Sequence, residues 1–94
     1  MKDGENIEYY DSGEIQSIIN YLDGNLHGES IGYYRSGEIS YKCNYINGKL
    51  YGEFIHYCES GEVYSKYYYI CDIFVTELEW IVYTRNIKFG LLGL

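Results

Sequence analysis

Glutamates recur at a fixed spacing along this 94-residue chain, and their pattern is the one that most directly suggests chemistry. Two sets of three follow a 24-residue spacing: Glu5, Glu29 and Glu53, and Glu14, Glu38 and Glu62. Aligned carboxylates could bind a cation or a basic partner. Carboxylates ~10 Å apart in water repel one another by only ~0.4 kcal/mol, however, so such rows need no cation beside them. The D-x-D-x-D-G spacing of calcium loops does not occur either. We therefore expect solvated acidic rows and no bound metal.

The cysteines and histidines form no catalytic or metal-binding pattern. Cys43, Cys58 and Cys71 contain no C-x-x-C pair and have no His cluster at zinc spacing nearby, so we interpret them as reduced thiols. The repeat geometry places no Cys or Ser clearly beside His27 or His56. No phosphate-binding glycine loop, H-E-x-x-H or G-x-S-x-G motif occurs. The sequence therefore predicts a protein that is not an enzyme and that uses no cofactor.

The elements that must position these side chains repeat every 24 residues. A Ser-Gly-Glu triplet occurs at residues 12–14, 36–38 and 60–62, and an Asp-Gly or Asn-Gly pair follows at residues 23–24 and 47–48. Both are turn signals between strand-like runs, so each unit predicts a β-hairpin. We expect one domain over residues 1–94, with repeats at about 4–27, 28–51 and 52–75 and a degenerate cap at 76–94.

Composition and charge agree with β structure and narrow the choice of partner. The chain has 14 Tyr and 11 Gly but no Pro, a mixture typical of pleated surfaces joined by turns. Its net charge of −7 repels phosphate backbones and anionic lipid headgroups, which argues against nucleic acid and disfavours membranes. No apolar run reaches the ~20 residues of a membrane helix and no apolar leader begins the chain, so we expect a soluble cytoplasmic protein.

Residue parity predicts the faces of the sheet. Because 24 is even and strand side chains alternate, each position keeps its face from one repeat to the next. We expect odd-numbered residues to form a mainly apolar face and even-numbered residues a wetter one. The aromatic stripe on the odd-numbered face is the candidate partner-binding site, and its residues are Tyr9, Tyr21, Tyr33, Tyr45, Tyr57 and Tyr69. The alternative interpretation is that these rings only pack against one another.

The fourth unit departs from the pattern. Asp72 and Thr76 stand where earlier units have glycine, and the Ser-Gly-Glu turn is missing. In strict register Glu79 falls on the apolar face, so we prefer a strand slipped by one residue, because an unpaired buried carboxylate costs several kcal/mol. The strict register remains the alternative. We expect the unit to close the end of the array, with an apolar set made of Trp80, Val82, Ile87 and Phe89.

The repeating unit resembles a known family. It reads Gly-Glu-x-Ile-x-Tyr-Tyr-x-Ser-Gly-Glu-Ile, then a Tyr, then Asp/Asn-Gly-x-Leu-x-Gly, which is similar to the MORN repeat and closest to its variant form, over about residues 4–70. The resemblance implies an all-β fold: a single-layer, elongated antiparallel sheet of tandem hairpins, used as a scaffold. Variant members occur in bacteria and large DNA viruses, and some bacterial members carry an antitoxin label.

Four functional hypotheses follow. The first is a non-catalytic scaffold that binds a protein partner through the aromatic stripe, with an unpaired sheet edge that also permits strand addition or oligomers. The second is an antitoxin-type or regulatory neutraliser of a specific basic protein. Lipid-headgroup binding is the third, and the acidic charge weighs against it. The fourth is a decayed gene product without a retained function.

Overall fold

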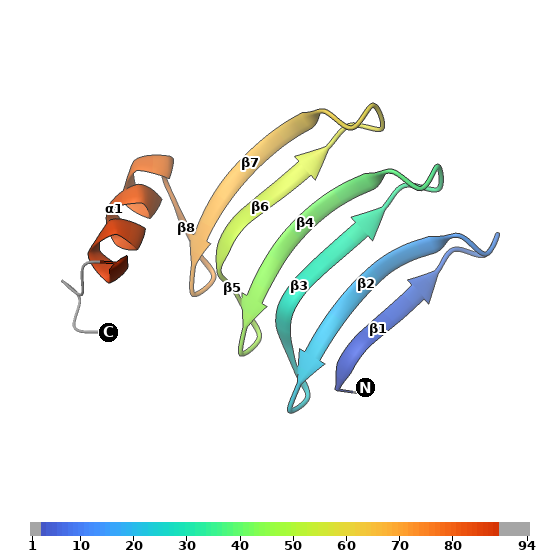
Figure 1. Ribbon diagram of the computed structural model, residues 1–94, viewed down its shortest axis with the longest axis horizontal. Coiled ribbons are helices and arrows are strands. Elements are labelled where there is room, and N and C mark those ends of the chain that lie inside the picture. Colours follow the sequence, from blue (N-terminus) through green and yellow to red (C-terminus); the bar gives the residue numbers. More distant parts are fainter. Residues whose placement is uncertain (1–2, 89–94) are drawn as a thin grey trace.

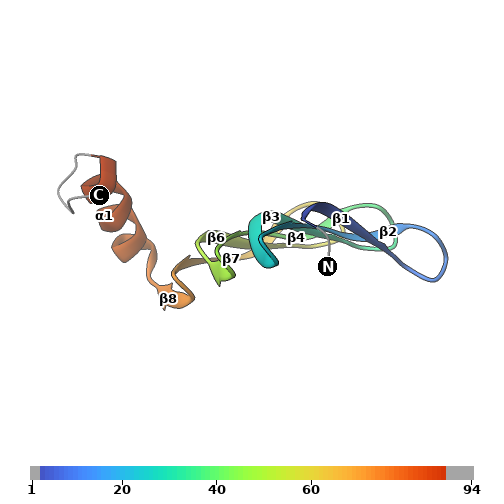
Figure 2. The same ribbon diagram turned by 90° about the horizontal axis from the view of Figure 1, so that it is seen from below.

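The computed structural model describes residues 3–88, which form one open antiparallel sheet followed by a helix (Figure 1). The elements are β1 Gly4–Tyr9, β2 Ile15–Leu22, β3 Asn25–Tyr33, β4 Ile39–Ile46, β5 Lys49–Leu50, β6 Gly52–Tyr57, β7 Val63–Ile70, β8 Ile73–Val75 and α1 Glu77–Lys88. The strand order is β1-β2-β3-β4-β6-β7-β8, and β5 pairs with β4. Figure 2 shows the sheet edge-on as a single layer, with α1 beyond its C-terminal end. The predicted fold class is therefore confirmed.

Glycines at positive φ close the three hairpins. In the first hairpin, Tyr10 N donates to the Glu14 carbonyl at 2.8 Å and Gly13 N donates to the Tyr10 carbonyl at 2.9 Å. Gly13 has a φ of 102°, a backbone conformation that residues with a Cβ rarely adopt. Equivalent bonds close the second and third hairpins. The Ser-Gly-Glu triplet therefore predicts this turn correctly.

The connections between hairpins are two-residue turns. Asp23 and Gly24 have φ values of 52° and 80°, the two positive values that a type I′ turn needs. The third connection keeps this conformation without a glycine, since Cys71 and Asp72 have φ values of 49° and 70°. The repeat therefore continues through β8, further than the missing glycine suggests, and ends only at Thr76.

Strand register corrects the predicted faces. Ile7 pairs with Ile18, and Ile31 pairs with Lys42, so paired residues have opposite parity. An even number of residues separates each such pair, and antiparallel partners share a face. Each face therefore takes odd-numbered residues from one strand and even-numbered residues from the next. The prediction of a common odd-numbered face was wrong, although each position does keep its face from repeat to repeat.

Tyrosine hydroxyls link consecutive hairpins. The Tyr10 hydroxyl donates to the Tyr33 carbonyl at 2.5 Å, and one repeat later the Tyr34 hydroxyl donates to the Tyr57 carbonyl at 2.5 Å. The corresponding residue of the third hairpin is Cys58. No fourth hairpin follows in the described part of the chain, so there is no next-repeat carbonyl there to which a tyrosine at position 58 could donate a hydrogen bond.

The C-terminal unit is a helix, and the expected slipped strand was wrong. Thr76 N donates to Glu79 Oε1 at 2.8 Å, and Glu79 N donates to Thr76 Oγ1 at 3.1 Å. This reciprocal pair is a capping box, which pairs two of the otherwise unbonded N–H groups at the start of a helix. Glu79 is exposed on this helix, so the buried carboxylate that motivated the slipped strand does not arise. Phe89 and residues 90–94 lie outside the described residues.

Ring packing holds the helix against the last hairpin. The Trp80 ring stacks on Tyr68 and on Tyr83, each with centroids 5.9 Å apart, and meets the edge of Tyr51 at 6.3 Å. Thr84 Oγ1 donates to the Trp80 carbonyl at 3.0 Å. Trp80 therefore contributes to the closing unit as predicted, but from a helix.

The hydrophobic core is thin. Within residues 3–88, Cys43 is the one buried apolar side chain, 3% exposed, and Ser17 and Ser30 are buried beside it in the sheet at 6% and 4%. A single layer has no second layer to cover either face. Its large side chains are consequently half-buried or exposed, and the question is what they contact.

Candidate functional site

One face of the sheet gathers aromatic side chains. We call it the aromatic face, and the buried Ser17, Ser30 and Cys43 lie on the same face. Cys43 is two residues along β4 from Tyr41 and from Tyr45 and pairs with Ser30, and Ser17 is four residues along β2 from Tyr21. The aromatic residues of this face are Tyr21, Tyr41, Tyr45, Phe54, His56, Tyr67, Tyr69 and Phe74. They come from five strands, β2, β4, β6, β7 and β8. The face is densest where the second and third hairpins meet.

Rings on the aromatic face pack against one another and still face solvent. Phe54 lies at the centre, with ring centroids 5.8 Å from Tyr41, 4.8 Å from His56 and 6.3 Å from Tyr69. Phe74 lies 6.0 Å from Tyr69 and remains 57% exposed. These are stacked and edge-to-face contacts of ordinary length. The face is therefore pre-ordered by its own contacts and still offers apolar area.

Gly32 is required by a close approach on this face. A Cβ built at Gly32 would lie 2.0 Å from Cε1 of Tyr41, so the tyrosine ring rests directly on the glycine backbone. Tyr41 and Gly32 are cross-strand partners. The missing side chain lets the Tyr41 ring lie flat on the sheet, toward Phe54.

The six tyrosines predicted as one stripe divide between the two faces. Tyr21, Tyr45 and Tyr69 lie on the aromatic face, paired with Gly4, Gly28 and Gly52. The other three lie on the opposite face, each two residues after an isoleucine of that face; they are Tyr9, Tyr33 and Tyr57. Parity reasoning missed the aromatic residues Phe54 and His56. Partner register, which the even spacing across each turn sets, is the signal that finds them.

Buried groups on the aromatic face are held in their neutral forms. Burial raises the pKa of the Cys43 thiol to about 11, and burial followed by the nearby Cys43 raises the pKa of Tyr45 to about 12. A thiol with a raised pKa carries almost no thiolate at neutral pH and is a poor nucleophile. Ser30 Oγ is buried without a hydrogen-bond partner among residues 3–88. None of these groups is activated for chemistry.

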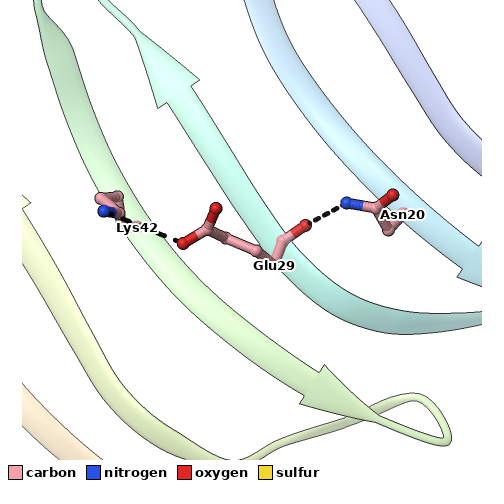
Figure 3. A network of polar contacts seen from close by, with 3 residues as sticks. All are labelled: Asn20, Glu29 and Lys42. Carbon is pink, nitrogen blue, oxygen red and sulfur yellow. Dashed lines mark hydrogen bonds and ion pairs between the residues drawn. The ribbon is translucent and has the colours of Figure 1, made fainter.

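The opposite face carries ion pairs, and we call it the charged face. Glu29 lies 3.8 Å from Lys42, and its main-chain carbonyl accepts a 2.9 Å hydrogen bond from Asn20 Nδ2 (Figure 3). One repeat later, Glu53 lies 3.4 Å from Lys66. The nearby Glu53 carboxylate raises the pKa of Lys66. All four charged side chains are 37–47% exposed, so each pair stabilises the fold only slightly.

The predicted glutamate rows divide between the charged face and the hairpin turns. Glu5, Glu29 and Glu53 stand in equivalent positions on β1, β3 and β6, whereas Glu14, Glu38 and Glu62 accept the main-chain bonds that close the turns. The Ser12 hydroxyl bonds the Glu14 carboxylate and lowers its pKa. Over the described part of the chain, no group of three or more His, Cys, Asp or Glu side chains could hold a metal ion.

Two shallow hollows lie near the helix. One, of about 340 Å³, is on the charged face between Glu53, Lys42 and the edge of Trp80. The other, of about 420 Å³, is on the outer side of α1 and includes Leu78 and Val82, which are 69% and 46% exposed. No helix within residues 3–88 is long and apolar enough to cross a membrane.

Comparison with known families agrees with the repeat architecture. Residues 2–23 and 26–47 match the sequence model of the MORN repeat variant, one match to each of the first two hairpins. The third hairpin lies outside these matches and keeps the same turn and strand positions. No curated protein and no solved structure matches the chain.

Proposed function

Since the chain carries tandem repeats of the MORN variant, we propose that it is a non-catalytic scaffold that binds a protein partner on the aromatic face. MORN repeats are generally associated with scaffolds that bind proteins or membranes. The observation that carries the proposal is the exposure of aromatic rings on a one-layer sheet: Tyr67 is 44% and Phe74 57% exposed. Aromatic side chains supply large contact areas at a low entropic cost, and they dominate many interfaces.

In this proposal the partner contacts three of the six predicted tyrosines and the aromatic rings beside them. Tyr21, Tyr45 and Tyr69 share the aromatic face with Tyr67 and Phe74. Tyr9, Tyr33 and Tyr57 stand on the charged face and would have to meet the partner by a separate contact. The contacts among the rings leave the face little to lose in side-chain freedom when it binds, which favours affinity.

The absence of catalysis is part of the proposal. The raised pKa of Cys43 makes that thiol a poor nucleophile. The Ser30 hydroxyl lies buried with no hydrogen-bond partner among residues 3–88, and His56 stacks on Phe54. A binding role accounts for these side chains by packing alone.

A regulatory neutraliser of a basic protein is the second candidate, and charge distribution favours it. Residues 3–22 contain five acidic side chains and no Lys, Arg or His. Residues 27–46, the equivalent stretch of the second repeat, contain two acidic residues together with Arg35 and Lys42. A partner that covers the first hairpin should therefore be basic. The same charge weighs against nucleic acid or anionic membrane as the partner.

Affinity capture with ring-deleted variants tests the scaffold. The full chain, the double variant Tyr67→Ser/Phe74→Ser and the control Tyr64→Ser would each be used as bait in extracts of the native host. Tyr64 is 78% exposed at a bulge in the β6–β7 pairing. Tyr64→Ser therefore removes an exposed ring from a position outside the aromatic face and serves as the control. We expect a partner held by the wild type and by Tyr64→Ser and lost with the double variant, while circular dichroism shows all three folded. Equal recovery of the partner with the double variant would refute the proposal that the partner binds the aromatic face.

A further inference from the structure

The two ends of the sheet differ. At the C-terminal end the short strand β8 pairs with the last three residues of β7, and α1 follows directly. At the N-terminal end β1 pairs with β2 alone among the described residues, so its outer side is an open strand edge (Figure 1). Open edges present main-chain N–H and C=O groups that readily pair with another strand.

The structure itself shows what such an edge accepts. β3 and β6 are the first strands of the second and third hairpins, and each receives an antiparallel strand, β2 and β4 respectively. β1 is the first strand of the first hairpin and has the same sequence pattern, yet it has no strand on that side within residues 3–88. A strand added to β1 would therefore continue an interface that the array already makes twice.

Charge at this edge is unbalanced. Lys42 lies opposite Ile31 and pairs with Glu29, and Lys66 lies opposite Ile55 and pairs with Glu53. In the first hairpin the residue opposite Ile7 is Ile18, so the position that supplies lysine to the other hairpins is apolar. Glu5 and Glu8 form no ion pair within the described residues.

The missing counter-charge can come from the side of the open edge. Lys42 also lies opposite Ile55 across the joint between the second and third hairpins. A lysine in the same position on a strand added to β1 would lie opposite Ile7, diagonal to Glu5. The neighbouring residue of that strand would lie opposite Glu8 on the aromatic face. Two adjacent basic residues would then serve the two carboxylates, one on each face.

We propose that the β1 edge binds an extended basic segment of a partner protein by antiparallel strand addition, with adjacent Lys or Arg side chains meeting Glu5 and Glu8. This deepens the proposed scaffold function and rests on it. A second copy of this chain fits the edge less well. Its first hairpin would bring the same five acidic side chains to the joint.

A peptide of defined chemistry tests the proposal on the full chain. The probe is the capped peptide Val-Thr-Lys-Lys-Val-Thr-Val, and its controls are the same peptide with Glu for Lys and one with alternate main-chain amides methylated. Methylation keeps the charge and removes strand pairing. Amide hydrogen exchange would be read at residues 4–9, and affinity would be measured at ~0.1 M salt, where exposed charges still act within ~10 Å.

We expect the lysine peptide to slow exchange at residues 4–9, and both control peptides to fail. The double variant Glu5→Gln/Glu8→Gln should weaken binding at least ~5-fold, whereas Glu59→Gln/Glu62→Gln, the same charge loss at the third turn, should change it less than ~2-fold. No binding, equal binding of the methylated peptide, or protection confined to other strands would overturn the proposal. Protection of residues 4–9 in the chain alone, appearing with dimerisation, would also overturn it and assign the edge to a second copy.

The outcome is separable from that of the scaffold. If the aromatic face captures a partner and the peptide does not protect β1, the strand-addition proposal is refuted and the scaffold proposal is supported. If the peptide protects β1 and the full chain captures no protein, the scaffold proposal is refuted and the strand-addition proposal is supported.

Discussion

Loss of the Tyr34 hydroxyl should weaken the joint between the second and third hairpins. That hydroxyl donates to the Tyr57 carbonyl at 2.5 Å across the joint, in a half-buried setting. Replacing Tyr34 by Phe keeps the ring and removes this bond alone. A hydrogen bond of this type contributes ~0.5–1.5 kcal/mol net, and a fully buried carbonyl left unpaired costs ~1–3 kcal/mol. Because water can reach a half-buried carbonyl, we expect Tyr34→Phe to lower the free energy of unfolding by ~1 kcal/mol.

Urea denaturation measures this loss through two signals. Far-ultraviolet circular dichroism follows the whole sheet, and the fluorescence of Trp80, the chain's single tryptophan, follows the end beyond the weakened joint. Coincident transitions would justify a two-state free energy. The control is Tyr64→Phe, since Tyr64 is 78% exposed and its hydroxyl forms no hydrogen bond within residues 3–88. A Tyr34→Phe variant as stable as the Tyr64→Phe control would refute the idea that hydroxyl-to-carbonyl bonds hold the repeats together.

Four further changes should have distinct effects on stability. Gly32→Ala should destabilise the fold by ~1–3 kcal/mol in thermal unfolding, because its Cβ would lie 2.0 Å from Cε1 of Tyr41 and displace that ring; an unchanged melting temperature would contradict the close approach. Ser30→Ala should leave stability unchanged or raise it, since it removes a buried hydroxyl without a partner, and a loss above ~1 kcal/mol would mean that the hydroxyl is bonded after all. Thr76→Ala should cost ~1 kcal/mol and reduce helical dichroism. The capping bonds from Thr76 lower the pKa of Glu79 below its ordinary value of 4.5, so stability from this group is present above pH 4.5 and disappears as pH falls through the lowered pKa. The stability difference between wild type and Glu79→Gln should shrink over that acidic range.

The repeat, its turns and the single-layer sheet were predictable because they depend on local chemistry. A type I′ turn needs two positive φ values, and Asp23-Gly24 supplies them. The faces were not correctly predicted, because parity along the chain does not give register across a turn. Ile7 pairs with Ile18 rather than with an odd-numbered residue, so the six-tyrosine stripe divides between the two faces.

The sequence contains a motif that predicts the start of the C-terminal helix. Thr76-Glu77-Leu78-Glu79 has the spacing of a capping box and places acidic residues in the first helical turn. A decaying repeat predicts a strand, in which Glu79 would be a carboxylate that must be kept off the apolar face. A helix start gives that carboxylate a partner instead. Conversely, Cys58 in place of a linking tyrosine marks the last hairpin, and this became clear only once the Tyr10 and Tyr34 bonds were known.

Site-specific photocross-linking tests the central claim, that the aromatic face binds a protein partner, most directly. A benzophenone amino acid would replace Tyr67 on the aromatic face, Glu53 on the charged face or the exposed Tyr64, and each protein would be irradiated in the native host. We predict one defined protein adduct from position 67 and none of that kind from positions 53 and 64. The same adduct at equal yield from all three positions, or from position 53 alone, would contradict the claim.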